Sequence, residues 1–454
     1  MKKFLYLLVA IATLLSASTQ AQPITLSEAL DILSSKNLEI KAASLDESMA
    51  KKDVDAVWGK NFGKLTFTQD VANSNDAGNV FGFKLSSREA TFGDFGFGAP
   101  NMPTNQNSPA YLTTPPSTLN YPDSREYYQS KLKYEVPLFT GFQLTNYEHI
   151  MKEVAKIKGL DKQKMINEKK YELKKTFYDV ALVQKSAKEL HKILDNINTL
   201  MNMTQAMIDE GYAKHVDLLE VKAKKANVQR LLIQMDSNEQ LLYHYLSFLL
   251  NQNVTSIITP KNDLIPTTLS DKEIIDRNLD IQKAKNGLRV KKDMVGVSQS
   301  AFYPTIGAFA EVSTADNTFL GDADKHKAYS VGARLTWNLF SGNTDSANMQ
   351  KARLEEMKTA TQVELAKRGI ALKISKIKTE ILEYTAEIKS LEQELLLANT
   401  IYANYEGRYK EKLVSMSDVI IKQSQQIEKI LKLQQIKNKR NERILALENL
   451  ANKE

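Results

Sequence analysis

The sequence predicts a mainly α-helical chain that also contains membrane β-strands and is built as a tandem internal repeat. Three observations predict this fold class. Two segments recur at fixed offsets, an apolar seam with heptad spacing runs through both copies, and shorter runs in each copy alternate between apolar and polar residues. At 454 residues the chain has the length of about two to four globular domains, but such long helices are not typical of compact cores.

The chain begins with the features of an export signal. Lys2 and Lys3 precede the apolar run 4–15, and small residues follow as far as Ala21. This order is typical of a cleaved secretory signal peptide, and the apolar run is too short to favour the alternative of an N-terminal membrane anchor. We therefore expect residues 1–21 to be removed and the mature chain to work outside the cytoplasm.

The composition excludes several classes of function. The chain has no cysteine, which excludes disulfide scaffolds, thiolate metal sites, thiol nucleophiles and lipid attachment through an N-terminal cysteine. A mean hydropathy of −0.37 with 25% charged residues argues against a bundle of membrane-spanning helices. The net charge of +7 does not by itself indicate a nucleic-acid partner, because basic residues must cluster to bind one.

Two offsets relate the copies. NLEIKAA at 37–43 returns as NLDIQKA at 278–284, an offset of 241, whereas PLFTGF at 137–142 returns as NLFSGN at 338–343, an offset of 201. The difference of 40 residues indicates an insertion in the first copy, and the proline-rich run 86–124 is its expected place. We expect repeats at 22–262 and 263–454, with 86–124 forming an extracellular loop.

Each repeat is expected to contain the same elements in the same order. They are a helix, a β-hairpin, a long helix and a return helix. In the first repeat these lie at 25–58, 64–138, 141–210 and 217–250, and in the second at 269–301, 304–340, 342–412 and 418–452.

The expected strands alternate in character. From Tyr329 to Leu339 every second residue is apolar, and the run 128–138 and the partner runs 65–85 and 305–313 show the same tendency. Period two over about ten residues is typical of a membrane β-strand with one face toward lipid and one toward a lumen. A half-buried sheet of a soluble domain gives the same alternation. Four such strands in an exported chain with very long helices favour the membrane.

The long helices carry a coiled-coil seam. The apolar positions follow 3-4 spacing from Ile374 to Tyr409, and the run 173–208 repeats them 201 residues earlier. No proline interrupts the run 342–412, so it predicts a helix about 100 Å long. A free-standing coiled-coil spacer would also show the seam, but it does not explain why both helices follow an alternating strand through the same Leu-Phe-Thr/Ser-Gly corner.

The small number of strands expected in one chain predicts an oligomer. The smallest closed membrane barrels have about eight strands, whereas this chain has four. An open sheet edge in lipid leaves backbone groups unpaired at a cost of several kcal/mol each. Three chains would form a barrel of about 12 strands.

With these features together, the chain resembles the TolC-type outer-membrane efflux proteins, the outer-membrane factor family. The resemblance covers almost all of the mature sequence and rests on the PLFTGF and NLFSGN corners, the entry SQSAFYPTIGAFAEVS at 298–313, and the turns EGYAKHVDLLEVK and YKEKLVSMSDVIIKQ. It implies a homotrimer with a 12-stranded β-barrel in the outer membrane of a Gram-negative bacterium. It also implies a long α-helical coiled-coil barrel in the periplasm.

In function, the resemblance implies the exit duct of a tripartite efflux or type I secretion system. The duct would dock to a periplasmic adaptor and, through it, to an inner-membrane transporter. No catalytic residue, cofactor or metal site is implied, and the absence of cysteine indicates a protein held by its barrel in outer-membrane lipid rather than by a lipid anchor.

This chain matches the gate residues of the family only in part. Asp418 matches an acidic residue at the family entrance, Asp217 occupies the equivalent position in the first repeat, and Tyr409 matches a gate tyrosine. A ring of such carboxylates would favour cations. Each aspartate is also well placed to interact with a helix N-terminus, and both roles are compatible. Gly211 in the first turn corresponds to Lys412 in the second, which would soften an acidic ring, and these residues with Ser415 are expected to contact the adaptor.

Other motifs do not indicate chemistry. The five histidines form no H-E-x-x-H pair, and His215 is expected to be a solvated turn residue. The glycine cluster near Gly96 lacks the strand and helix of a nucleotide-binding loop. A soluble periplasmic coiled-coil adaptor or spacer is the alternative function.

Overall fold

The computed structural model describes residues 23–452 apart from 261–263, 320 and 323, so the expected signal peptide lies outside the described residues. The chain divides into two compact units. Unit 1 comprises Met1–Met49, Lys156–Gly287 and Ala360–Glu454, and unit 2 comprises Ala50–Ala155 and Leu288–Thr359. Because the unit boundaries cut four of the helices described below, the polypeptide passes between the units within helices and not through loops.

Most described residues are helical, in two series that follow the repeat. The helices of the first repeat are α2 (Leu26–Lys36), α3 (Leu38–Gly59), α7 (Gln143–Asp209) and α8 (His215–Leu250). Those of the second repeat are α9 (Asp271–Arg277), α10 (Leu279–Gln299), α11 (Thr344–Lys410) and α12 (Met416–Leu450). Helices α7 and α11 have 67 residues each, which gives each a contour length of about 100 Å.

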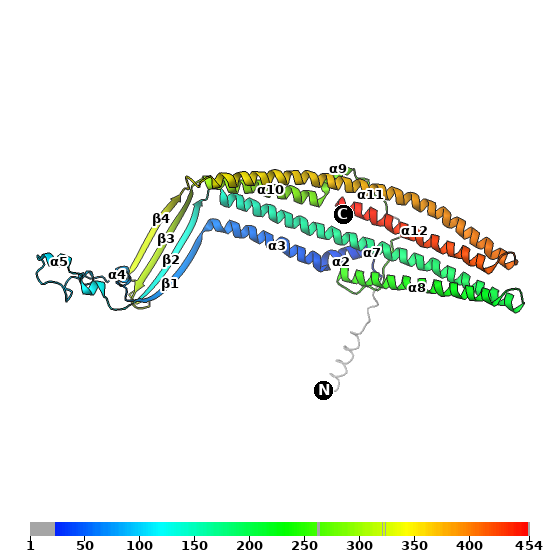
Figure 1. Cartoon of the computed structure of the whole chain (residues 1–454), viewed down its shortest axis with the longest axis horizontal. Helices are drawn as coiled ribbons and strands as arrows, with labels where there is room; N and C mark the ends of the chain where they lie inside the picture. The colour runs from blue at the N-terminus through cyan, green and yellow to red at the C-terminus, as the bar shows by residue number, and fades with distance from the viewer. Residues whose placement is uncertain (1–22, 261–263, 320, 323, 453–454) are drawn as a thin grey trace, which may run out of the picture. The chain divides into compact units, whose positions relative to one another are not determined.

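Unit 2 contains one four-stranded antiparallel sheet (Figure 1). Its strands are β1 (Lys64–Ser74), β2 (Arg125–Phe139), β3 (Thr305–Asp316) and β4 (Lys327–Thr336). They pair in chain order, so β1 and β4 are the two edges. The prediction of a mainly helical, duplicated chain with four strands is therefore confirmed.

The first helix of each repeat is broken, so the predictions of single helices at 25–58 and 269–301 are wrong. Asn37 separates α2 from α3, and Asn278, 241 residues later, separates α9 from α10. Each asparagine has extended backbone geometry. Asn37 Oδ1 accepts a hydrogen bond from the Ile40 N–H at 3.0 Å, and Asn278 Oδ1 accepts one from the Ile281 N–H at 3.2 Å. Each side chain therefore caps a new helix N-terminus.

The same two asparagines also satisfy the ends of the return helices. Asn37 Nδ2 donates to the Leu249 carbonyl at 2.8 Å, and Asn278 Nδ2 donates to the Leu450 carbonyl at 3.2 Å. The last carbonyls of a helix have no partner within the helix. Because Leu249 and Leu450 are themselves 201 residues apart, the duplication has preserved a contact between distant parts of the chain.

The insertion is more ordered than the predicted loop. The run 86–124 contains η2 (Phe92–Phe95), α5 (Pro109–Thr113) and α6 (Ser117–Asn120). The helix α4 (Ala77–Ser86) precedes it, so the strand predicted over 65–85 ends at Ser74. Asp76 caps α4 by accepting a hydrogen bond from the Asn79 N–H at 3.0 Å, and the Phe83 ring stacks on Tyr127 of β2 with centroids 4.0 Å apart. Capping and ring packing therefore favour a helix where the sequence suggested continued alternation.

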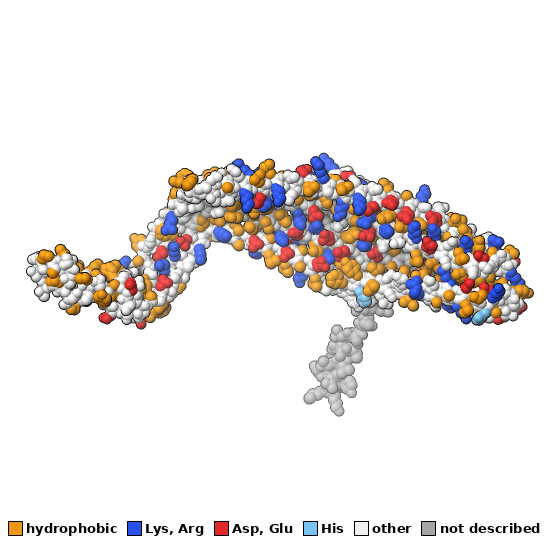
Figure 2. All heavy atoms as spheres, viewed as in Figure 1, with side chains coloured by type: hydrophobic (Ala, Val, Ile, Leu, Met, Phe, Trp, Pro, Cys, Tyr) orange, Lys and Arg blue, Asp and Glu red, His pale blue; other side chains and the backbone are white. Residues whose placement is uncertain are grey.

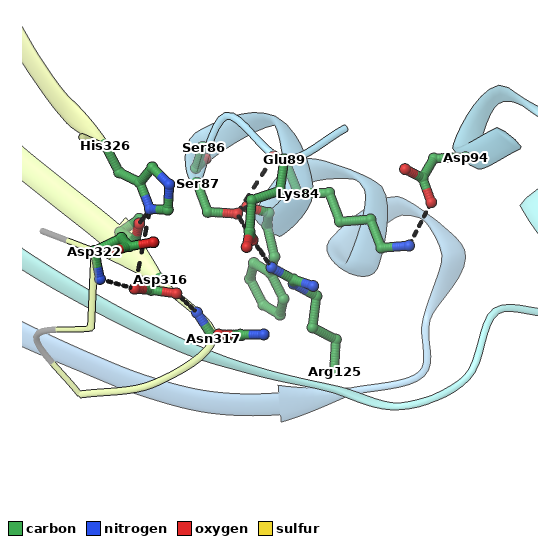
Figure 3. Close-up of polar contacts among 12 residues, drawn as sticks. Lys84, Ser86, Ser87, Glu89, Asp94, Arg125, Asp316, Asn317, Asp322 and His326 are labelled. Carbon is green, nitrogen blue, oxygen red and sulfur yellow. Dashed lines mark hydrogen bonds and ion pairs between the residues drawn. The ribbon is translucent and has the colours of Figure 1, made fainter. Parts of the chain in front are cut away.

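Ion pairs hold the insertion and the β3–β4 connection in place (Figure 3). Lys84 of α4 pairs with Asp94 of η2, and Arg125 at the start of β2 pairs with Glu89. At the end of β3, the Asp316 carboxylate accepts hydrogen bonds from the backbone N–H groups of Asn317 and Asp322. The segments at this end of the sheet are thus fixed by local polar contacts.

Unit 1 has its core along the predicted seam. The described seam positions of α11 that are buried include Ile374, Ile377, Ile381, Leu391, Tyr402 and Tyr409. Three of their equivalents in α7, Leu173, Val180 and Leu190, are buried, and so is the α7 seam residue Ile197. The opposite faces carry interspersed charges of both signs (Figure 2). This division is what coiled-coil packing of long amphipathic helices requires.

Replacing the capping asparagines tests the duplicated contact. Asn37→Ala and Asn278→Ala should each destabilise the chain by about 2 kcal/mol, because each removes a helix cap and leaves a carbonyl at the end of a return helix without its donor. Thermal unfolding followed by far-ultraviolet circular dichroism measures the loss. Asn196→Ala, at an exposed position of α7, is the control. Equal midpoints for all three variants would contradict the assignment.

Candidate functional site

The four-stranded sheet has one apolar face whose described side chains are exposed to solvent. The register aligns Phe67, Leu132, Val312 and Tyr329 in one row across all four strands. These side chains are exposed by 66%, 45%, 55% and 84%. A second row is formed by Leu65, Tyr134, Ala310 and Val331. Contiguous exposed apolar surface of this kind marks a lipid or protein interface.

The opposite face of the sheet is polar and charged, because alternate residues of a strand point to opposite sides. One of its rows consists of Thr66, Lys133, Glu311 and Ser330. Lys133 pairs with Glu135 at 2.7 Å, and Lys131 pairs with Glu311 at 3.9 Å. A sheet with one apolar and one charged face has the character of a wall between lipid and water.

Aromatic side chains gather where the strands meet the helices. Trp58 at the end of α3 packs edge-on against Phe62 with ring centroids 4.5 Å apart, and Phe142 packs against Tyr303 at 5.6 Å. The indole Nε1 of Trp337 donates to the Phe302 carbonyl at 3.2 Å. Such aromatic belts form at membrane–water interfaces because the rings are amphipathic. The signal was present in the sequence, at WGKNF, AFY and TWNLF, but it was not identified there.

The predicted Leu-Phe-Thr/Ser-Gly corners turn each outgoing strand into a long helix. In both corners two successive residues have positive φ, Gly141 and Phe142 at +61° and +67°, and Gly342 and Asn343 at +60° and +68°. At Gly141 an added Cβ would lie 2.7 Å from the Ser300 carbonyl oxygen. The first corner therefore needs glycine both for its backbone geometry and for the close approach of a neighbouring segment.

At the other end of the long helices, the two turns share one hydrogen-bond pattern. In the first turn, Gly211 N–H donates to the Ile208 carbonyl and Tyr212 N–H donates to the Met207 carbonyl. In the second turn, Lys412 and Leu413 make the equivalent bonds to the carbonyls of Tyr409 and Arg408. This is the Schellman arrangement, which requires a left-handed residue after the helix. Gly211 has φ +75° and Lys412 has φ +62°. A lysine in that geometry costs about 1 kcal/mol.

A contact between the two turns involves that lysine. Lys412 Nζ lies 3.1 Å from the centroid of the Tyr212 ring. This cation–π contact joins the left-handed residue of the second turn to an aromatic ring of the first turn. Ser417 Oγ donates to the Glu220 carboxylate at 2.8 Å, which joins the starts of α8 and α12. The structure thus brings Gly211 and Lys412 into neighbouring turns.

The predicted acidic pair lies at the start of the return helices. The Asp217 carboxylate accepts from the Lys214 N–H at 2.9 Å, and the Asp418 carboxylate accepts from the Ser415 N–H at 3.1 Å and hydroxyl at 2.6 Å. The bonds from Ser415 lower the pKa of Asp418. Both carboxylates therefore carry out the helix-capping role, and within one chain neither bonds to the other among the described contacts.

Tyr409 occupies a different environment from the aspartates. Its side chain is only 4% exposed and lies in a hydrophobic cluster with Met416, Val419 and residues of α7 and α8. Burial raises the pKa of its hydroxyl. Tyr409 is therefore a packing residue of the four helices near the turns.

The described residues offer no metal-binding cluster and no membrane-spanning helix. No cluster of three or more His, Cys, Asp or Glu side chains suited to a metal ion occurs among them. No helix in the described part of the chain has the length and apolarity needed to span a membrane.

Comparison with known proteins finds a family model that matches part of the chain. Residues 272–453 match the family model described as outer membrane efflux protein. No curated protein sequence matches the chain.

Solved structures with the same fold cover nearly the whole chain. CusC, described as forming a transmembrane channel, is 11% identical with a TM-score of 0.76 over 94% of this chain and 91% of its own. The outer membrane protein VceC of Vibrio cholerae is 15% identical with a TM-score of 0.75, over 94% and 96%. The MtrE outer membrane channel of Neisseria gonorrhoeae is 13% identical with a TM-score of 0.73, over 94% and 88%.

A pair of glycine substitutions tests the turn geometry. Neither Gly211 nor Gly407 has an atom within 4 Å of an added Cβ, but only Gly211 has positive φ. Gly211→Ala should destabilise the chain by about 1 kcal/mol through backbone strain. Gly407→Ala, inside α11, should stabilise it by up to about 1 kcal/mol. Chemical denaturation measures both, and effects of the same sign would contradict the left-handed assignment.

Proposed function

We propose, from the match of residues 272–453 to the outer membrane efflux protein family model, that this chain is one of three identical subunits of an outer-membrane exit duct. The duct serves a tripartite efflux or type I secretion system. It receives substrates from an inner-membrane transporter and conducts them across the periplasm and the outer membrane. It has no catalytic role and no cofactor.

The sheet carries this proposal. Its apolar face, with Tyr329 84% and Val331 74% exposed, would be unfavourable in water, whereas its other face carries ion pairs that are unfavourable in lipid. A wall between lipid and a water-filled lumen satisfies both faces. The aromatic belt around Trp58 and Trp337 supports an interface with lipid head groups at the end of the strands where the long helices begin.

The open edges support a trimer. One chain supplies four strands with unpaired groups along β1 and β4, and lipid offers those groups no hydrogen bonds. Three chains would pair every β4 with the β1 of the next chain and form a barrel of about 12 strands. A barrel of this size leaves room for a lumen, in keeping with the charged face of each sheet.

The helices support a periplasmic duct. Helices α7 and α11 each have a contour length of about 100 Å, and their apolar seams favour side-by-side packing into a helical barrel. The expected export signal and the absence of cysteine support delivery to the outer membrane of a Gram-negative bacterium without a lipid anchor. The alternative of a soluble periplasmic adaptor or spacer leaves the apolar face of the sheet in water.

The helix turns are proposed as the periplasmic gate and the docking site. Asp217 and Asp418 would form an acidic ring in the trimer, and buried Tyr409 would support the helices that bear it. Tyr212 and Leu413, with 62% and 66% of their surface exposed, flank Gly211, Lys412 and Ser415. These turns offer an apolar surface with polar edges to a periplasmic adaptor protein.

Membrane fractionation tests the duct against the soluble alternative. The protein should sediment with outer membranes and resist extraction by carbonate. Purified in detergent and added to a planar bilayer, it should open conducting pores. Recovery as a soluble periplasmic species would contradict the proposal.

Two neighbouring residues of β4 test which face meets lipid. Val331→Arg places a charge on the apolar face and should cost about 2–4 kcal/mol per chain in the membrane, which would reduce the amount of assembled protein in outer membranes. Ser330→Arg adds the same side chain to the polar face, opposite Glu311, and should assemble normally. Equal assembly of both variants would exclude a lipid-facing role for this face.

Cation block tests the acidic ring. Asp217→Asn combined with Asp418→Asn should weaken block of single-channel current by a trivalent cation about tenfold, while the amides keep an acceptor for the capping bonds. Asp236→Asn, about five turns further along α8, is the control. Because hydrogen bonds from Ser415 lower the pKa of Asp418, block should persist as the pH falls through the ordinary aspartate value of about 3.9. Unchanged block in the double variant would contradict the ring.

A further inference from the structure

Unit 1 contains a cavity of 520 Å³ that neither the proposed gate nor the sheet uses. Side chains of α7, α11 and α12 line it, together with Thr259 and Pro260 from the segment after α8. The volume lies within the range of small-molecule sites, about 300–1,000 Å³. Because α7 belongs to the first repeat and α11 and α12 to the second, an occupant would touch both repeats.

The lining of this cavity is strongly basic. It includes Lys185, Lys389, Lys437 and Arg440, and its one carboxylate is Glu392. Lys437 pairs with that carboxylate at 2.7 Å. Among the described residues no carboxylate pairs with the other three cations. The lining therefore has an excess of positive charge, which attracts an anion.

The excess arises at a base of α12 that lacks an acidic partner on α11. Helices α11 and α12 are joined by ion pairs between a glutamate of α11 and a base of α12, at Glu394–Lys429, Glu392–Lys437, Glu387–Lys432 and Glu380–Arg443. Arg440 lies among these bases, but its partner on α11 is Thr385. Arg440 thus contacts a neutral residue, whereas these four bases of α12 contact glutamates.

Thr385 orients the arginine without neutralising it. Arg440 Nε donates to Thr385 Oγ1 at 3.1 Å, and that hydroxyl donates in turn to the Ile381 carbonyl at 2.6 Å. The described hydrogen bonds of Arg440 use Nε alone. A guanidinium held in this way presents its remaining N–H groups to an oxyanion, which it can bind with two parallel hydrogen bonds.

We propose that this cavity binds a small solute bearing phosphate or carboxylate groups. Arg440 and Lys389 would contact the oxyanions. Tyr178, Leu182 and Ile388 supply apolar surface for the remainder of the solute. A bound anion would supply the counter-charge that Arg440 lacks on α11, and it would join α7 to α11 and α12. The site lies outside the sheet and the helix turns, so it goes beyond the proposed duct function.

Calorimetry on the full chain in detergent tests the site, with inorganic pyrophosphate and citrate as separate probes. At least one probe should bind saturably and more weakly as salt is added. Arg440→Gln and Lys389→Gln should each weaken that binding about tenfold, because each removes a charge that contacts the anion. Lys439→Gln is the matched control, since Lys439 is exposed, adjacent to Arg440 and absent from the lining.

Thr385→Glu separates loss of binding from loss of folding. It supplies the carboxylate that Arg440 lacks on α11, so it should abolish anion binding while raising the midpoint of thermal unfolding. Preference for pyrophosphate would identify phosphate as the ligand group, and preference for citrate would identify carboxylate. Absence of saturable binding by both probes, or equal binding by the wild type, Arg440→Gln and Thr385→Glu, would overturn the proposal. Pore conductance, measured in parallel, reports on the duct function independently.

Discussion

The hydrogen-bonding groups along the free edges of the sheet are the constraint on which the rest of this account depends. β1 and β4 each present a row of backbone donors and acceptors that no other strand pairs in the part of the chain that the structure describes. In water such edges promote aggregation, and in lipid they are prohibitively costly. The apolar face of the same sheet favours a lipid environment. We propose closure with other copies of the chain, which would satisfy the edges and both faces together.

Duplication supplies the matching parts. The helix break at Asn37 and Asn278, the positive-φ corners at Gly141 and Gly342, and the helix-ending bonds at Gly211 and Lys412 are the same local solutions used twice. Departures from the symmetry are equally informative. The ordered insertion occurs in the first repeat, and the left-handed lysine, held over Tyr212, occurs in the second. Each departure lies at an end of the strands or helices, where packing between neighbouring strands or helices does not constrain the sequence.

Sequence reasoning succeeded where a pattern is local and failed where a contact is distant. Period-two alternation predicted the strands, and 3-4 spacing predicted the seam through Ile374 and Tyr409, because each depends on which face of an element is buried. The break at Asn37 was missed because its cause is the Leu249 carbonyl, far away in the sequence. Helix α4 was missed because Phe83 stacks on a ring of β2. At the turns, the offset of 201 identified the equivalent residues, whereas the capping bonds of Asp217 and Asp418 required the structure.

Disulfide cross-linking between β1 and β4 of neighbouring copies tests the closed sheet most directly. The natural chain has no cysteine, so introduced pairs are the only thiols present. Thr68→Cys in β1 is combined in turn with Ser330→Cys, Arg334→Cys and Thr336→Cys in β4, all on the polar face, and outer membranes are oxidised. The account predicts that at least one pair gives a covalent product of three chains on a non-reducing gel. Single chains alone for every pair, or products larger than three chains, would contradict it.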